Sequence, residues 1–162
     1  MKNYKLILWM TCIILTFCLP CLGGENTFNR EVEKNLVEKA LRNNIGWAKN
    51  KDIQLLYSGI ANDTSYLVVN PSSRITRGLQ DVKKSEAFWM SPDFKAIRYE
   101  IKDLTINFSR SGDVAWFFCI LDDINEWKGQ PANWENTRWT GVLEKRDGNW
   151  IIVQMHFSFP RK

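Results

Sequence analysis

The last third of the chain, residues 112–160, reads as three consecutive β-strands and limits the fold more than any other feature. Runs rich in β-branched and aromatic residues cover 113–121, 135–145 and 150–159. The last two runs are joined by Asp147-Gly148. Asp-Gly between two such runs predicts a tight hairpin, because a type I′ turn needs positive φ at both central residues. These strands indicate an antiparallel sheet, and they carry no sequence motif that identifies an activity.

The first 23 residues have the three-part layout of a secretory signal peptide. A short basic start, Met1–Lys5, precedes an apolar run at 6–19 that is too short to span a bilayer comfortably. Small residues then lead to Gly23, after which we expect cleavage. The expected location is therefore secreted or periplasmic, with no membrane attachment after cleavage. A lipid anchor on Cys18 or Cys21 is the second alternative, and the intact mass of the exported protein would distinguish the two.

Removing this segment changes what the composition implies. It takes away Lys2 and Lys5 and leaves 20 basic residues against 18 acidic ones, interspersed along the chain. Because the basic and acidic residues are interspersed, the sequence shows no basic stripe like that of a nucleic-acid-binding protein. No nucleic-acid partner is therefore expected. Three of the four cysteines also leave, and Cys119 remains in an apolar strand as a buried, inert thiol. The remaining 139 residues suffice for one domain with its own hydrophobic core.

Hydrophobic spacing predicts helices upstream of the strands. Apolar residues recur every three or four positions over 30–49, where Asn29 is the expected N-cap. Asp52 is expected to cap a short second helix, and helical spacing returns over 79–90. The sequence therefore predicts about three helices before the long strands.

The intervening segments predict further β-structure. A short strand pair is expected at 65–70 and 74–77. In the run 96–108 the apolar positions change parity at Lys102-Asp103, which predicts a β-bulge and hence a bent sheet. Residues 125–133 contain Gly and Pro and are expected to form a loop too long for a tight turn. Helices grouped beside an antiparallel sheet predict an α+β domain.

This order of elements resembles the nuclear transport factor 2-like superfamily, and within it the SnoaL-like branch. The resemblance covers residues 28–160, the expected domain. The terminal strands are also similar to the calcium/calmodulin-dependent kinase II association domain. The matching positions are Trp47 and Asp52, Gly112–Trp116, Arg138–Thr140, Arg146–Trp150 and His156–Ser158.

The resemblance implies a cone-shaped α+β fold. A curved antiparallel β-sheet would carry about three N-terminal helices packed on its concave side, with a ligand pocket between sheet and helices. Members are commonly dimers through the outer sheet face. The superfamily includes isomerases, cyclases, dehydratases, ligand binders and pure assembly domains, so the function has to be argued from the site.

The final hairpin supplies the first candidate ligand-binding residues. With a two-residue turn at Asp147-Gly148, Arg138 pairs with Phe157 and Thr140 with Met155, and paired residues share a face. Arg138 and Thr140 then lie together on a largely apolar face. Both faces of this hairpin are largely apolar, and one layer of helices can cover only one of them. The other face is therefore predicted to form a homodimer interface.

A guanidinium on an apolar face needs a partner, because a lone buried charge is costly. Arg138 could clamp a ligand carboxylate or phosphate, or it could form a structural ion pair with Asp122 or Asp123. His156, the single histidine, could act as a general base or acid or could simply hold the last strand in place. In this register Arg138 and His156 lie on opposite faces unless a bulge intervenes.

Aromatic side chains are candidates for a pocket wall, although most large aromatic residues form ordinary core. Five come into question: Tyr57, Tyr66, Trp47, Trp89 and Trp116. The candidate ligand-binding set is Arg138, Thr140, Trp116, Tyr57 and Asp122, and the candidate catalytic residue is His156. No metal or other cofactor is expected, because neither zinc-ligand spacing nor a Gly-rich phosphate loop is present in the sequence.

The sequence thus predicts an exported domain that binds a small molecule in a cup between sheet and helices. A first alternative is an isomerase, cyclase or dehydratase that works by proton transfer on a carbonyl-bearing ligand. A second alternative is an oligomerisation module without a ligand.

Overall fold

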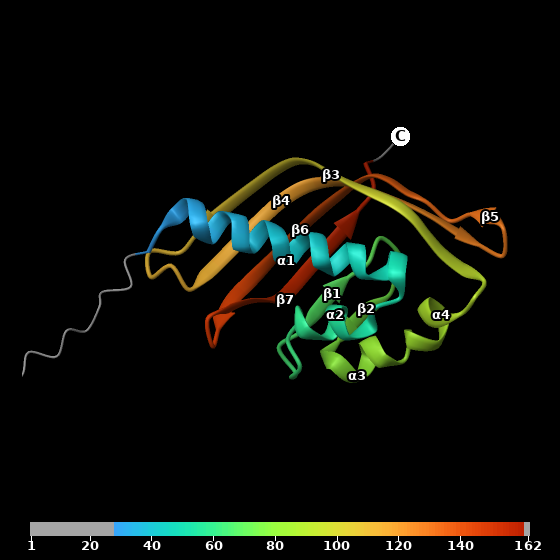
Figure 1. Ribbon diagram of the computed structural model, residues 1–162, viewed down its shortest axis with the longest axis horizontal. Coiled ribbons are helices and arrows are strands. Elements are labelled where there is room, and N and C mark those ends of the chain that lie inside the picture. Colours follow the sequence, from blue (N-terminus) through green and yellow to red (C-terminus); the bar gives the residue numbers. More distant parts are fainter. Residues whose placement is uncertain (1–27, 161–162) are drawn as a thin grey trace, which may run out of the picture.

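The computed structural model describes residues 28–160, which form a strongly curved sheet with helices on its concave side (Figure 1). The predicted signal peptide, with Cys12, Cys18 and Cys21, lies outside these residues. None of the helices between residues 28 and 160 is long and apolar enough to cross a membrane. In chain order the elements are α1 (Arg30–Asn50), α2 (Ile53–Ser58), β1 (Leu67–Val69), β2 (Ile75–Arg77), α3 (Gly78–Lys83), α4 (Glu86–Met90), β3 (Phe94–Phe108), β4 (Val114–Trp127), β5 (Gln130–Pro131), β6 (Trp134–Arg146) and β7 (Asn149–Ser158).

The α+β fold is confirmed, but the sheet is mixed rather than purely antiparallel. Its order is β2-β1-β7-β6-β4-β3, with β5 paired to β4. β1 runs parallel to β7, and the other strand pairs are antiparallel. A parallel pair needs a long connection, and here most of the domain lies between the two strands. Local sequence predicts that β1 pairs with β2, but it does not mark β7 as the second neighbour.

Helix α1 begins and ends where local chemistry predicts. The Asn29 side chain accepts hydrogen bonds from the backbone N–H groups of Glu31 and Val32, and Lys51 closes the helix in the left-handed region at φ 54°. Its buried stripe faces the sheet and lies mainly along β3 and β7. The stripe consists of Glu33, Val37, Leu41, Asn44 and Trp47.

The helical spacing over 79–90 produces two short helices, so the described residues contain four helices rather than about three. α3 ends at Lys83, and the buried Ser85 precedes α4. Lys51 anchors the far end of α4, because its Nζ donates to three backbone carbonyls at 2.6–3.0 Å. These carbonyls belong to Trp89, Ser91 and Phe94.

The loop expected at 125–133 is instead a short hairpin. β4 continues to Trp127, and the chain turns at Lys128-Gly129 before returning as β5. Both turn residues have positive φ, 51° and 75°, which is the geometry of a tight primed turn. Only Gly129 signals this turn in the sequence, since lysine rarely adopts positive φ.

Register shifts bend the sheet at several points. The predicted bulge in β3 is confirmed by a shift between Lys102 and Thr105, where Asp103 lies at φ 54°. Further shifts occur between Ala96 and Arg98 in β3, between Leu121 and Asp123 in β4, and at the Val142/Leu143 step of β6 against β7. Because bulges increase local bend and twist, these shifts give the sheet its concave face.

The predicted turn between β6 and β7 and the four residue pairs next to it are confirmed, but the predicted register is wrong beyond Leu143. Asp147 and Gly148 occupy positive φ, 50° and 81°, as a type I′ turn requires. The shift at Val142/Leu143 leaves Val153 as an extra residue in β7. Arg138 consequently pairs with Ser158, not Phe157, and Thr140 pairs with His156, not Met155. Because the side-chain period of a strand is two, this slip brings Arg138 and His156 onto one face.

The inner face of the sheet forms the core. Alternate residues of β4 point inward, and Trp139 of β6 lies among them with ring centroids 5.0 Å from Phe117 and 5.5 Å from Phe157. Cys119 is fully buried here, and burial raises the pKa of its thiol to about 12. This agrees with the expected inert thiol.

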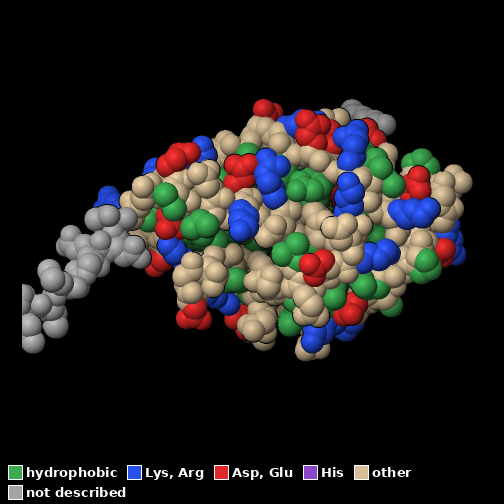
Figure 2. Space-filling view, viewed as in Figure 1, with side chains coloured by type: hydrophobic (Ala, Val, Ile, Leu, Met, Phe, Trp, Pro, Cys, Tyr) green, Lys and Arg blue, Asp and Glu red, His purple; other side chains and the backbone are tan. Residues whose placement is uncertain are grey.

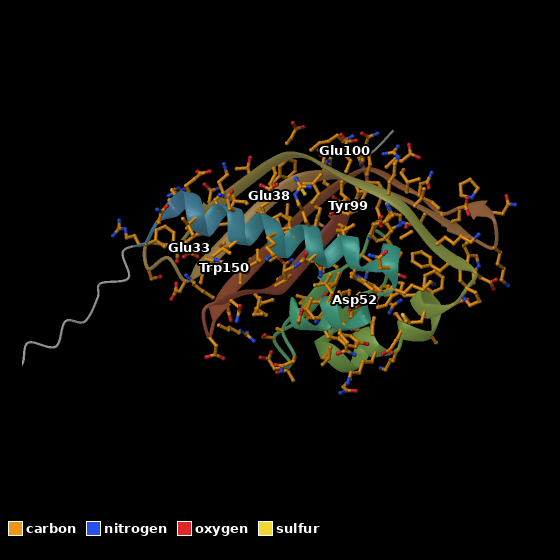
Figure 3. All side chains as sticks on the ribbon, in the orientation of Figure 1. Glu33, Glu38, Asp52, Tyr99, Glu100 and Trp150 are labelled. Carbon is orange, nitrogen blue, oxygen red and sulfur yellow. The ribbon has the colours of Figure 1, made fainter. Side chains whose placement is uncertain are left out.

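A buried carboxylate fastens α1 to the final hairpin. Glu33 accepts hydrogen bonds from Lys145 Nζ at 2.6 Å and from Trp150 Nε1 at 2.8 Å. Figure 3 shows Glu33 on α1 beside Trp150 on β7. Burial favours the neutral acid, but the bonds from Lys145 and Trp150 outweigh it and hold the pKa of Glu33 below its ordinary value of 4.5.

We predict that Glu33→Ala lowers the free energy of unfolding by roughly 2–4 kcal/mol at pH 7, because it leaves Lys145 and Trp150 without their acceptor. Glu38→Ala on the same helix is the control. It removes only a surface pair with Arg42, for which about 0.5 kcal/mol is expected. Urea denaturation measures both variants, and equal losses would contradict the role of Glu33. A depressed pKa stabilises the fold above pH 4.5, so the effect should shrink as pH falls through the folded-state pKa.

Candidate functional site

A cavity of about 370 Å³ lies between the helices and the concave face of the sheet; we call it the cup. Its volume is at the lower end of the range for small-molecule pockets. Side chains from every helix and from most strands line it. They are Asn44, Ile45, Trp47, Ala48, Leu56, Tyr66, Val68, Asn70, Arg74, Thr76, Val82, Phe88, Trp89, Phe94, Asp123, Asn125, Ala132, Trp134, Met155 and Phe157.

Most of the cup wall is apolar and aromatic. Trp47 of α1 meets Trp89 of α4 edge to face, with ring centroids 5.6 Å apart. Trp134 meets Phe157 in the same way at 5.3 Å on the sheet side. The buried Tyr66 also lines the cup, and burial raises the pKa of its hydroxyl. Such a wall favours a flat or apolar ligand body.

Two buried amide atoms in the cup lack hydrogen-bond partners among the described residues. They are Nδ2 of Asn44, a donor, and Oδ1 of Asn125, an acceptor. Both side chains are only 6% exposed. Asn44 belongs to the buried stripe of α1, and Asn125 is held in place because its backbone N–H donates to Asn133 Oδ1 at 3.1 Å. An unpaired buried polar group costs about 1–3 kcal/mol, so both amides suit a ligand that supplies an acceptor and a donor.

Asp123 is the acidic residue of the cup wall. Burial raises its pKa above the ordinary value of 3.8, and the interaction with Asn125 opposes this shift only in part. No ion pair involving Asp123 occurs within residues 28–160. A carboxyl whose protonation lies closer to neutrality can exchange a proton with a bound ligand, as general acid–base chemistry requires.

The neighbouring Asp122 points to the opposite face and has a different environment. It pairs with Lys102 at 2.6 Å and accepts the backbone N–H of Asn136 at 2.7 Å. The bond from Lys102 contributes most to holding the pKa of Asp122 below its ordinary value. This ion pair occupies the carboxylate that was one expected partner of Arg138.

The structure places four of the predicted site residues on the outer face of the sheet rather than in the cup. Arg138, Thr140, Trp116 and His156 lie close together there, on β4, β6 and β7. Arg138 is exposed and forms no ion pair with Asp122 or Asp123 in the described part of the chain. The alternation along β4 and β6 directs Trp116, Arg138 and Thr140 outward, and the bulge at Val153 brings His156 of β7 onto the same face. A ligand contact by any of the four stays a prediction.

Tyr57 lies outside the cup as well. Its hydroxyl donates to Glu86 Oε2 at 2.6 Å, and burial together with this bond raises its pKa to about 12. It lines an outer hollow of about 650 Å³ between α1, α2 and the β6–β7 turn, more polar in its lining than the cup. No unpaired buried atom points into this hollow among the described residues, so the cup is the better candidate site.

The polar residues of the cup occupy positions in the sequence pattern that could have identified them. In β4 the inward positions are Ala115, Phe117, Cys119 and Leu121, and this parity continues to Asp123 and Asn125. Asn44 likewise falls on the apolar stripe of its helix. Polar residues at core positions of otherwise apolar patterns are typical of functional sites.

Within residues 28–160, no group of three or more His, Cys, Asp or Glu side chains is arranged to hold a metal ion. On the face shown in Figure 2, basic and acidic side chains are interspersed and do not form a patch of one sign. The described residues that line the cup supply amides, a carboxyl, hydroxyls and the guanidinium of Arg74.

Comparisons with known proteins agree with this architecture. Residues 37–162 match the model of a family described as a SnoaL-like domain. A search of curated proteins returned no match. A nuclear transport factor 2-like protein from Cytophaga hutchinsonii has a TM-score of 0.65 at 15% identity, with 82% of this chain and 100% of that chain covered.

Two further solved structures show how varied such neighbours are. A provisionally described dehydratase of the nuclear transport factor 2-like family from Streptomyces avermitilis has a TM-score of 0.70 at 17% identity, covering 83% of this chain and 100% of its own. The association domain of C. elegans calcium/calmodulin-dependent kinase II has a TM-score of 0.60 at 13% identity, covering 80% and 97%. At these identities the likeness concerns the fold alone.

The raised pKa of Asp123 predicts how the stability of the fold depends on pH. Asp123 has a raised folded-state pKa, so the fold loses stability as pH rises from about 3.8 to that pKa and stays at the lower level above it. Asp123→Asn should therefore raise the free energy of unfolding at pH 7, by about 0.5–2 kcal/mol, and change it less at pH 4. Thermal melts of both proteins at the two pH values measure this, and destabilisation at pH 7 would contradict it.

Proposed function

This chain belongs to the SnoaL-like domain family, and we propose that it is a ligand-binding domain that holds a small molecule in the cup. The observation that carries the proposal is the pair of buried amide atoms, Asn44 Nδ2 and Asn125 Oδ1, that line an apolar cavity without partners. A folded protein rarely retains such groups unless something else satisfies them. A ligand with an apolar body and a polar end that both donates and accepts would do so.

Two alanines of α1 offer a matched test. Ala48 lines the cup and Ala40 lines the outer hollow, and both are half-buried on the same helix. The neutral fluorophore N-phenyl-1-naphthylamine serves as the probe, since it needs only an apolar cavity. We predict that the unmodified protein binds it, that Ala48→Phe weakens binding at least tenfold by filling the cup, and that Ala40→Phe leaves binding within twofold.

Fluorescence titration measures these affinities, and circular dichroism checks that each variant is folded. Equal loss in the two variants would place the probe elsewhere and contradict the cup as its site. Absence of binding to the unmodified protein would contradict the proposed function.

A proton-transfer enzyme is the second candidate, and Asp123 is the observation that favours it. Its carboxyl lines the cup, and burial raises its pKa above the ordinary value, a direction of shift that is common in catalytic acids and bases. The dehydratase description belongs to the Streptomyces avermitilis neighbour and supports this candidate only by similarity of fold. Deuterium incorporation at the α-carbon of 2-tetralone, a flat ketone, separates the candidates: an enzyme accelerates it and loses this in Asp123→Asn, whereas a pure binder does not accelerate it.

We also propose that the outer face of the sheet forms a homodimer. Two rows of directly paired residues cross this face from β2 to β4. One row is Ile75, Val69, His156, Thr140 and Phe118, and the other is Arg77, Leu67, Gln154, Val142 and Trp116. Trp116 is 46% exposed and Phe118 39%. Clustered exposed aromatic side chains on a sheet are typical of a protein–protein interface. Association is a property named for the kinase II neighbours, and it supports the proposal here by likeness of fold.

We predict that Trp116→Glu converts a dimer into a monomer, because it replaces an exposed aromatic side chain with a charge on each subunit of the proposed interface. Leu36→Glu is the control, since Leu36 is 42% exposed but lies on α1, on the other side of the sheet. Light scattering at micromolar concentration gives the mass of each protein. A monomeric unmodified protein, or a dimer that survives Trp116→Glu, would contradict the interface.

A further inference from the structure

Arg74 is the only lysine or arginine among the residues that line the cup, and the proposed function gives it no role. It lies in the turn between β1 and β2, and its side chain is exposed. It therefore stands where the cup meets solvent. Phe88 and Trp89 of α4 belong to the same wall.

The backbone around Arg74 is well held. Its N–H donates to Ser72 Oγ at 3.3 Å, and its carbonyl accepts from the backbone and side-chain nitrogens of Asn70 at 3.2 and 3.3 Å. One guanidinium nitrogen, Nη2, donates to Oγ of the buried Ser85. The backbone of Arg74 is thus fixed by the turn, and Ser85 holds one nitrogen of its guanidinium.

The charge of Arg74 is not neutralised within residues 28–160. It forms no ion pair there. Asp81 is near enough for Arg74 to contribute to lowering its pKa, but Asp81 is already bound by Lys84 Nζ at 2.6 Å, the largest cause of that shift, and by the Arg77 backbone N–H. A guanidinium has five N–H donors in a planar fork, and Arg74 spends one of them on Ser85.

These observations indicate which kind of ligand would fit the cup. A free planar fork of donors matches a carboxylate, which it can bind through two parallel hydrogen bonds. The single positive charge matches a single negative one, and the aromatic wall requires an apolar body.

We infer that the ligand of the cup is an apolar monocarboxylic acid whose carboxylate is bound by Arg74 at the mouth and whose body lies against the aromatic wall. This inference rests on the proposed function, because it requires an occupied cup. From the sequence, Arg138 was either an anion clamp or half of a structural ion pair; the clamp inferred here is Arg74 instead.

The test compares 2-naphthoate with 2-naphthamide, two probes of one shape that differ in charge. Calorimetry should show at least tenfold tighter binding of naphthoate than of naphthamide to the unmodified protein. Arg74→Leu should remove this preference and leave the amide affinity within twofold. Arg138→Leu, an exposed arginine on the outer face, is the control and should leave both affinities unchanged.

Two further measurements keep the test decisive. Arg74→Lys should retain part of the preference, because it keeps the charge but loses the planar fork. Raising the salt concentration should weaken naphthoate binding and leave naphthamide binding unchanged. A preference that survives Arg74→Leu, or equal affinities for acid and amide, would overturn the inference.

The two proposals fail in different ways. A cup that takes up N-phenyl-1-naphthylamine but shows no preference for naphthoate refutes the acid and leaves the binding function standing. A protein that binds none of the three probes refutes both.

Discussion

The curvature of the sheet is the constraint on which the rest of the structure depends. A flat sheet under α1 would leave no enclosed volume, because one helix packs directly against one face. Register shifts in β3, β4, β6 and β7 bend the strands instead, and the bend holds the far ends of β4 and β6 away from α1. The short helices and the β1–β2 pair then close the space as the cup. Glu33 fastens the near end, where α1 meets the final hairpin.

The bulges also explain what the sequence could and could not predict. The bulge at Lys102-Asp103 was predictable, because polar and apolar residues alternate there and the parity visibly changes. The Asp147-Gly148 turn was predictable from backbone chemistry alone. The bulge at Val153 left no such mark, since the residues on both faces of β7 are largely apolar at that point. A one-residue slip there leaves the hydrophobic pattern unchanged, yet it puts Met155 and Phe157, which line the cup, on the opposite face from Arg138 and Thr140.

The polar residues of the cup were not predicted from the sequence, for a related reason. Asn44 and Asn125 look like solvent-facing residues when each is taken singly, and only the parity of their elements places them inside. Arg74 lies in a turn that local sequence describes well, but its position at the cup depends on β1 lying beside β7. That parallel pairing joins segments far apart in the chain, and no local propensity encodes it. The fold was therefore largely predictable from local signals, whereas the site depends on long-range register.

The polar groups of the cup also affect the stability of the fold. Each buried amide without a partner costs about 1–3 kcal/mol in the unliganded protein, and burial of the Asp123 carboxyl adds to this near neutral pH. A protein of this size has only about 5–15 kcal/mol of net stability, so polar atoms without partners are a substantial cost to the fold. A ligand that satisfies these groups binds only the folded state and stabilises it by RT ln(1 + [L]/Kd), about 2.7 kcal/mol at a hundred times Kd. The free-energy cost of these polar groups and the affinity for a ligand then have the same origin, because the fold positions the groups without giving them a hydrogen-bond partner.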